Sequence, residues 1–136
     1  MEICADADRR LEWAKRLAQK LSMGEICIKT VIFSDEKRFL IDGPDMHRKE
    51  KSVRELFYKR LFSPSFIVWA GIGFNGTTSL HITESSIDAQ RYVNILQEDY
   101  LPFHRNRYIL MHDNAPPHCA HLTKSYLETK KIVSLE

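Results

Sequence analysis

The chain has 136 residues, 43% of them hydrophobic and 28% charged, which is the composition of a single soluble globular domain. Its net charge of +2 is too small to indicate nucleic-acid binding by itself, and its apolar runs are too short to span a membrane. The N-terminus lacks the apolar region of a signal peptide, and the three cysteines share no C-x-x-C spacing. We therefore expect an intracellular chain with free thiols.

The first third of the chain predicts one helix followed by two strands. Residues 8–21 carry apolar side chains at three- and four-residue steps, and Gly24 ends the predicted helix. The apolar residues before position 34 predict a strand over 26–33 that is buried on both faces. Residues 35–38 are all charged and predict a turn, after which residues 39–41 form a second strand. Residues 42–45, Asp-Gly-Pro-Asp, then predict a break.

Residues 47–60 are the most basic segment, with six Lys or Arg against two Glu. One interpretation is an arm that contacts phosphates, and the other is a solvated helix whose apolar side chains pack inward. Both stay open, because a packed helix still presents its basic face to DNA. The basic side chains are Arg48, Lys49, Lys51, Arg54, Lys59 and Arg60.

The rest of the chain predicts a hairpin followed by alternating helices and strands. Residues 66–72 predict a strand, and Asn75-Gly76 is a hairpin signal with residues 77–82 returning antiparallel. A helix is predicted over 88–100, with Asp88 or Ser86 as its cap, then a strand over 108–111. A helix after Pro117 and a strand from Ile132 follow. This order predicts an α/β domain with a mixed sheet and helices on its faces.

Two aspartates follow apolar strands in this pattern. Asp35 comes after the run that ends at Phe33, and Asp113 comes after the run that ends at Met111. Carboxylates brought together repel each other, which raises a pKa or calls for a cation between them. Oxygen ligands select Mg²⁺ or Mn²⁺, and a pair of such ions activates water or a 3′-hydroxyl against a phosphodiester. Isolated acids of this kind are often only turn formers or helix caps.

The same stretch also contains a possible zinc cluster of His112, His118, Cys119 and His121. A structural zinc site needs four convergent nitrogen or sulfur ligands, whereas His118 and Cys119 are adjacent and point to different sides of a helix. The favoured interpretation places His118 and His121 near a helix N-terminus, facing the carboxylates or the solvent. A small hydrolase with an unrelated metal site is a further alternative.

Several motifs, in their order and spacing, resemble the Tc/mariner DDE/D transposases of eukaryotic DNA transposons. They cover almost the whole chain: residues 10–15 (RLEWAK), 31–39 (VIFSDEKRF), 42–45 (DGPD), 68–70 (VWA), 92–103 and 112–118 (HDNAPPH). The resemblance implies an RNase H-like fold with a mixed five-stranded sheet flanked by helices, truncated at its C-terminal end. Residues 1–25 would then be a linker helix, and residues 26–136 a partial DDE catalytic domain.

The resemblance also implies a function. Asp35 and Asp113 would bind Mg²⁺, with Mn²⁺ as a substitute, for cleavage at transposon ends and strand transfer into target DNA. The implied partner is double-stranded DNA, with the six basic residues above and His118 as contacts. A homodimer is compatible with the resemblance, whereas a membrane or a small-molecule substrate is not expected. Nuclear localisation follows from the resemblance alone.

The chain departs from the family pattern in three places. The sequence starts after the place where the family's helix-turn-helix modules would be expected. The segment over 46–51 lacks the family's aromatic residues, and the family's last acid would be expected beyond Glu136. A two-metal site without one carboxylate loses charge and geometry, so we expect this chain alone to be catalytically inactive and one sheet face to be partly bare. The alternative is a domesticated or relic module that binds DNA or protein without catalysis.

Overall fold

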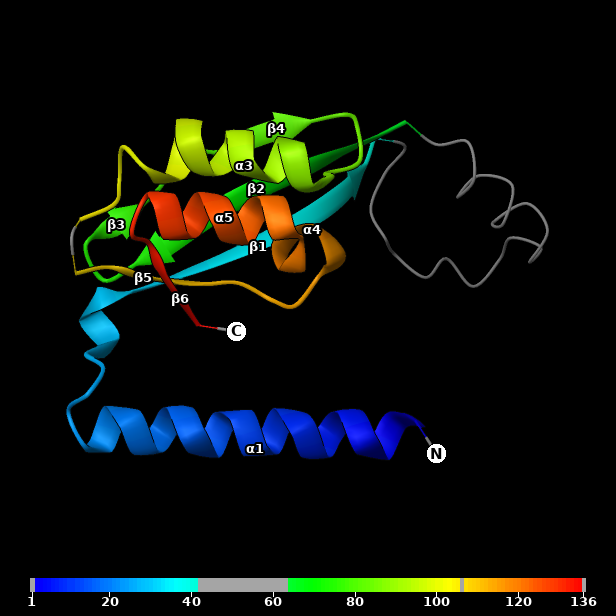
Figure 1. Cartoon of the computed structure of the whole chain (residues 1–136). Coiled ribbons are helices and arrows are strands. Elements are labelled where there is room, and N and C mark those ends of the chain that lie inside the picture. Colours follow the sequence, from blue (N-terminus) through cyan, green and yellow to red (C-terminus); the bar gives the residue numbers. More distant parts are fainter. Residues whose placement is uncertain (1, 42–63, 106, 136) are drawn as a thin grey trace.

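The computed structural model describes residues 2–41, 64–105 and 107–135, with side chains from residue 7 onward (Figure 1). The predicted turn at 42–45 and the basic segment at 47–60 lie outside these residues. The elements are α1 (Glu2–Ser22), η1 (Ile28–Thr30), β1 (Val31–Leu40), β2 (Ser65–Gly73), β3 (Gly76–Thr77), β4 (His81–Thr83), α3 (Ala89–Ile95), η2 (Leu96–Tyr100), β5 (Ile109–Met111), α4 (Pro116–Cys119), α5 (His121–Thr129) and β6 (Val133–Leu135).

The strands form one mixed sheet in the order β3-β2-β1-β5-β6, with β4 also paired to β2. β2 runs antiparallel to β1, β3 and β4, whereas β5 is parallel to both β1 and β6. The predicted mixed sheet is therefore confirmed. Among the described residues the sheet has six strands, whereas the family resemblance implied five. The strands expected over 26–33 and 39–41 form the single strand β1, and the return strand expected over 77–82 is split into β3 and β4.

Thr78 causes this split. Its backbone N–H donates to the carbonyl of Gly71 at 2.8 Å, and its side-chain oxygen accepts from the Gly71 N–H at 2.8 Å. The hydroxyl thereby replaces a backbone acceptor of the next strand, and the chain leaves the ladder until His81. The hairpin begins where Gly73 pairs with Gly76, whose φ of 130° suits glycine.

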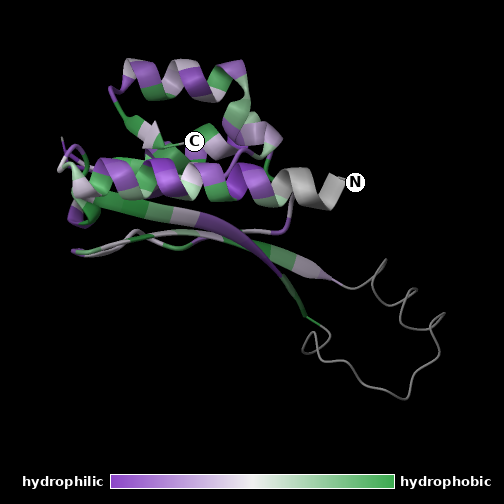
Figure 2. Ribbon diagram, turned by 90° about the horizontal axis from the view of Figure 1, so that it is seen from below, coloured by the Kyte–Doolittle hydropathy of each residue, from purple (hydrophilic) through white to green (hydrophobic). Residues whose placement is uncertain are grey.

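β1 is longer than the sequence pattern predicts. The turn expected at residues 35–38 is absent, and the strand continues from Val31 to Leu40. β2 explains the difference, because it pairs with β1 without interruption from Phe33 opposite Ile72 to Leu40 opposite Ser65. The charged middle of the strand is held by this backbone ladder and not by burial, and Figure 2 shows it as a polar stretch between apolar ends.

Helices α3 and α5 cover one face of the sheet (Figure 1). Asp88 caps α3 by accepting from the N–H of Arg91 at 2.8 Å, as predicted, and the helix continues into the π-helical turn η2. The buried core lies between these helices and the sheet. Its members are Ile32, Trp69, Tyr92, Ile95, Leu96, Tyr100, Leu110, Leu127 and Ile132.

The described helices leave much of the opposite sheet face uncovered. Side chains alternate along a strand, so Phe33 and its partner Ile72 point away from the face that buries Ile32 and Trp69. Both are exposed, as are Ile82 and Val133. The partly bare apolar face expected from the sequence is thus present among the described residues.

Helix α1 begins six residues before the predicted start and lies apart from the sheet (Figure 1). Its described side chains are exposed or half-buried, and Leu11 of the predicted apolar stripe is 54% exposed. The helix that this periodicity predicts is therefore confirmed, and Leu11 of its apolar stripe is exposed. None of the described helices has the length and apolar character needed to cross a bilayer.

Candidate active site

The parallel pairing of β1 with β5 places Asp35 and Asp113 at equivalent positions. Phe33 pairs with Met111 at the last paired position of the two strands, and each aspartate lies two residues beyond that pair. Asp35 is still within β1, which continues along β2, whereas Asp113 lies in the loop after β5. The expectation that two strands deliver two aspartates to the same end of the sheet is met, although only Asp113 follows a strand end.

The loop after β5 holds the Asp113 carboxylate by local hydrogen bonds. Its Oδ1 accepts from the N–H of Ala115 at 2.9 Å, a turn typical of aspartate. Pro116 and Pro117 then begin α4, where a proline costs no hydrogen bond because the first helical N–H groups have no partner. This short helix brings His118 back to Asp113.

His118 connects Asp113 to Glu36. Its Nδ1 lies 2.8 Å from Asp113 Oδ1 and 2.9 Å from the Asp113 carbonyl oxygen, and its Nε2 lies 3.1 Å from Glu36 Oε1. Because both ring nitrogens face carbonyl or carboxylate oxygens, which accept hydrogen bonds, this arrangement favours the imidazolium form, in which both nitrogens donate. Burial lowers the pKa of His118, but the hydrogen bonds and charges of Glu36 and Asp113 outweigh burial and raise the pKa above its ordinary value.

Buried aromatic rings support this arrangement from the core. Tyr92 of α3 has its hydroxyl 3.0 Å from His112 Nδ1, and its ring centroid is 4.1 Å from that of His118. Burial, together with the charge of Glu36, raises the pKa of Tyr92, so the phenol stays neutral. On β1, the Ser34 hydroxyl donates to the Met111 carbonyl at 3.1 Å and ties the two strands together just before the acids.

The two aspartates differ from His118 in exposure. Asp35 and Asp113 are exposed, and the hydrogen bonds among the described residues engage only Oδ1 of each, from the N–H of Glu36 in the case of Asp35. No hydrogen-bond donor from the described part of the chain contacts either Oδ2 atom, so both are available to a ligand from solvent. Such oxygens fit a hard divalent cation, which takes one or two protein carboxylates together with water and phosphate oxygens.

The zinc cluster considered from the sequence does not form among the described residues. His112 and His118 are buried and bonded to Tyr92 and to the acids, while His121 is exposed. Cys119 faces Asn114 at 3.9 Å. Within the described ranges, the one His/Cys/Asp/Glu group with convergent ligand atoms is elsewhere, at His81, Glu98 and Asp99.

None of the predicted DNA-contact residues is placed at an accessible surface by the described part of the structure. Arg48, Lys49, Lys51, Arg54, Lys59 and Arg60 lie outside the described residues. His118 is 3% exposed and has both ring nitrogens engaged, so its surface is closed to a direct DNA contact in this arrangement. Sequence reasoning missed Glu36 as its partner. Strand alternation was the available signal, since Glu36 must point to the face opposite Asp35.

The mixed sheet and its flanking helices define an RNase H-like fold of the kind found in transposase catalytic domains. The catalytic domain of Mos1 mariner transposase superposes with a TM-score of 0.66 at 18% identity, covering 94% of this chain and 58% of that one. A Mos1 mariner paired-end complex with Mn gives a TM-score of 0.69 at 18% identity, covering 94% and 41%. At such identities the likeness concerns the fold.

A sequence relative identifies the family. The chain is 31% identical over 137 aligned residues to the Tc3 transposase of Caenorhabditis elegans, an alignment that includes 94% of this chain. No protein-family model matches the chain. By sequence and fold the chain is a catalytic-domain fragment of the Tc/mariner transposases, and it spans about 40% of the length of the Tc3 relative.

Proposed function

We propose that Asp35 and Asp113 are two carboxylate ligands of a divalent-metal site for DNA cleavage and strand transfer in cut-and-paste transposition. The observation that carries this proposal is their common position, two residues beyond the Phe33–Met111 pair, with Oδ2 of each unengaged by the described residues. The metal ions would be Mg²⁺, with Mn²⁺ as a substitute, and solved Mos1 paired-end complexes include one with Mg and one with Mn.

A bound pair of such ions activates the attacking oxygen and stabilises the leaving oxygen of a phosphodiester. The residues of the chain hold and orient this site. Asp35 is fixed by the backbone ladder of β1 and β2, and Asp113 by Ala115 and His118. His118 in turn is held by Glu36, so a buried histidine supports one exposed metal ligand from behind.

The partner in this proposal is double-stranded DNA at transposon ends and at the target. Support comes from the Mos1 transposase, whose paired-end complex contains the left transposon end. A homodimer and a nuclear location are part of the same proposal, because transposition joins two ends and acts on chromosomal DNA. The proposal needs no small-molecule substrate.

The 136-residue chain by itself would bind metal without turning over DNA. Among the described residues, no third carboxylate or histidine joins Asp35 and Asp113 in a group with convergent ligand atoms. A two-metal site that keeps only two of its three carboxylates loses most of its activity, since the ligands of such a site act as a unit. The second candidate function is a binding module without catalysis, which the exposed apolar sheet face around Phe33 and Ile72 favours.

The test is a graft of this chain into the corresponding part of the Tc3 transposase, assayed for excision of Tc3 ends. We expect excision by the graft, its loss with Asp35→Asn or Asp113→Asn, and its retention with Asp88→Asn, which keeps a good helix cap. Excision that survives both active-site substitutions would refute the site. Metal-dependent nicking of plasmid DNA by the isolated chain, lost with Asp35→Asn, would instead refute its inactivity.

A further inference from the structure

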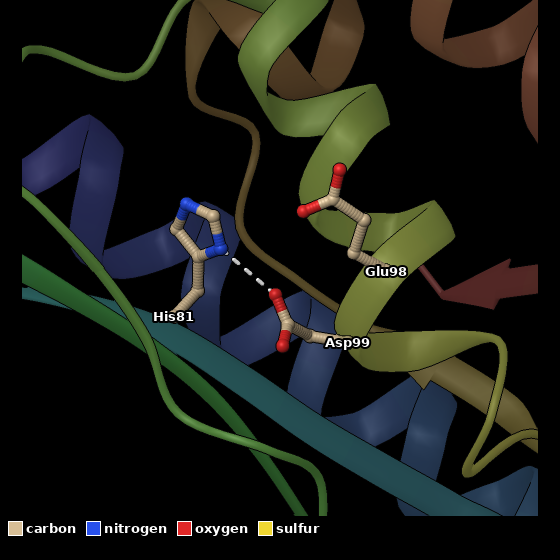
Figure 3. A group of neighbouring side chains, drawn as sticks. All are labelled: His81, Glu98 and Asp99. Carbon is tan, nitrogen blue, oxygen red and sulfur yellow. Dashed lines mark hydrogen bonds and ion pairs between the residues drawn. The ribbon is translucent and has the colours of Figure 1, made fainter.

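A second group of metal-ligating side chains lies away from the aspartates, between β4 and η2. It consists of His81, Glu98 and Asp99, each of which offers one ligand atom, and these three atoms lie within 4.8 Å of one another. Figure 3 shows both carboxylates on the side of the helix that faces His81. We propose that these three residues bind a first-row transition-metal cation of the Zn²⁺ class.

The geometry fits such an ion after a small adjustment. His81 Nδ1 lies 2.8 Å from Asp99 Oδ2, a hydrogen-bond distance. Two ligands held tetrahedrally at about 2.0–2.1 Å from zinc are roughly 3.3 Å apart, so this pair opens by about half an ångström when a metal replaces the shared proton. The three ligand atoms lie within 4.8 Å of one another, so the third ligand, from Glu98, moves inward by up to about 1.5 Å to reach that separation.

The two acids of this group are adjacent in the sequence. Glu98 and Asp99 both lie in the π-helical turn η2, a wider turn than an α-helix and one often found at functional sites. The side chain of Asp99 is 13% exposed and that of His81 is 27% exposed, while Glu98 is open to solvent. Two ligands are thus held by the fold, and the third closes the site from the solvent side, leaving a position for water.

The ligand set distinguishes this site from the aspartate site. An imidazole with two carboxylates favours zinc and its neighbours, whereas oxygen-only ligands favour Mg²⁺. The two sites share a row of the sheet, because Trp69 pairs with His81 on one side and with Glu36 on the other. Two strand spacings of about 4.8 Å put His81 roughly 10 Å from Glu36, with fully buried Trp69 between them.

Bound metal would join β4 to the helix that follows it. β4 has three residues and pairs with β2 alone among the described strands, so few backbone hydrogen bonds hold it. A cation that binds only the folded state raises its stability by mass action. The bound metal would therefore hold the end of the hairpin against η2, with its fourth position left to water.

The test is Zn²⁺ binding to the whole 136-residue chain by calorimetry, in excess Mg²⁺. Other ligands are removed by replacing Cys4, Cys27 and Cys119 with serine and Asp35 and Asp113 with asparagine. We expect one Zn²⁺ per chain and a higher Tm on binding. Glu98→Gln, at an exposed position that leaves the fold intact, should weaken binding at least about tenfold, and His81→Ala should weaken it further.

His121→Ala is the matched control, because His121 is an exposed histidine on α5. Its affinity for Zn²⁺ should equal that of the parent chain. Binding that is equally strong in the Glu98→Gln, His81→Ala and parent chains would overturn the proposal. Absence of Zn²⁺ binding to the folded parent chain at millimolar concentration would overturn it as well.

Discussion

His118 holds Asp113 from inside the protein, with its Nδ1 2.8 Å from Asp113 Oδ1 while its side chain is only 4% exposed. A buried histidine that supports an exposed carboxylate is a positioning residue, since it contacts the proposed metal ligand and not the metal.

Substitution of His118 separates its two hydrogen bonds. Asparagine places an amide near the Nδ1 position and keeps the donor to Asp113, whereas glutamine reaches the Nε2 position and keeps the donor to Glu36. We expect His118→Gln to weaken Mn²⁺ binding by about 10–100-fold and His118→Asn to weaken it less. Mn²⁺ titration monitored by electron paramagnetic resonance gives both affinities. Equal loss in the two variants would mean that His118 only fills space.

Thr78→Val should destabilise the fold through one hydrogen bond. Valine has nearly the shape of threonine, but it removes the oxygen that accepts from the Gly71 N–H and leaves that buried donor unpaired. We expect a loss of about 1–3 kcal/mol in the free energy of unfolding, measured by urea denaturation. Thr77→Val, at the exposed neighbouring position, is the control and should change stability by less than about 0.5 kcal/mol.

His104 should make the fold less stable in mild acid. Burial lowers its pKa below 6.5, so the unfolded chain takes up its proton first as the pH falls. Its contribution to stability is therefore complete above the unfolded pKa and is lost as the pH falls through the folded pKa.

His104→Asn removes this titration and keeps an acceptor for the Tyr100 hydroxyl, which lies 3.0 Å from His104 Nδ1. The free energy of unfolding, compared between pH 7.5 and pH 5, should fall less in this variant than in the parent chain. In the control variant His121→Asn, the free energy of unfolding should fall by as much between these pH values as it does in the parent chain. An unchanged pH dependence in the His104 variant would contradict the assigned shift.

Leu110→Ala tests the packing beneath the Asp113 loop. Leu110 is fully buried at the centre of β5 and pairs with Ile32 of β1. A cavity at this position should cost about 2–5 kcal/mol. The same substitution at Leu122, which is 44% exposed on α5, should cost far less in the same denaturation experiment. Comparable losses at the two positions would show that β5 is not part of the core.

The common position of the two acids could be predicted from the sequence because each follows a short, continuous apolar run. Such a run, without helical or alternating periodicity, is typical of a strand in the interior of a sheet. Sequence reasoning failed at residues 35–38, where four charged residues look like a turn. Pairing with β2 overrides that local preference, and such pairing between distant segments leaves no mark in the local pattern. The π-helical turn η2 was likewise not predicted, since the apolar stripe over 88–100 fits an ordinary helix.

The roles of histidine were predicted only in part. His118 was expected near the carboxylates or in solvent, and it lies beside Asp113, but its bond to Glu36 depends on the extra length of β1. The group at His81, Glu98 and Asp99 was not found from sequence, because its members come from a split strand and a π-helical turn. Neither feature follows from hydrophobic periodicity.

The central claim is that Asp35 and Asp113 together bind divalent metal, and Mn²⁺ binding to the folded chain tests it most directly. The titration is carried out in a His81→Ala background, which removes the second cluster, and compares Asp35→Asn, Asp113→Asn and the control Asp88→Asn. We predict that each active-site substitution removes the bound Mn²⁺ while Asp88→Asn retains it. Retention of Mn²⁺ with both active-site acids replaced would contradict the assignment.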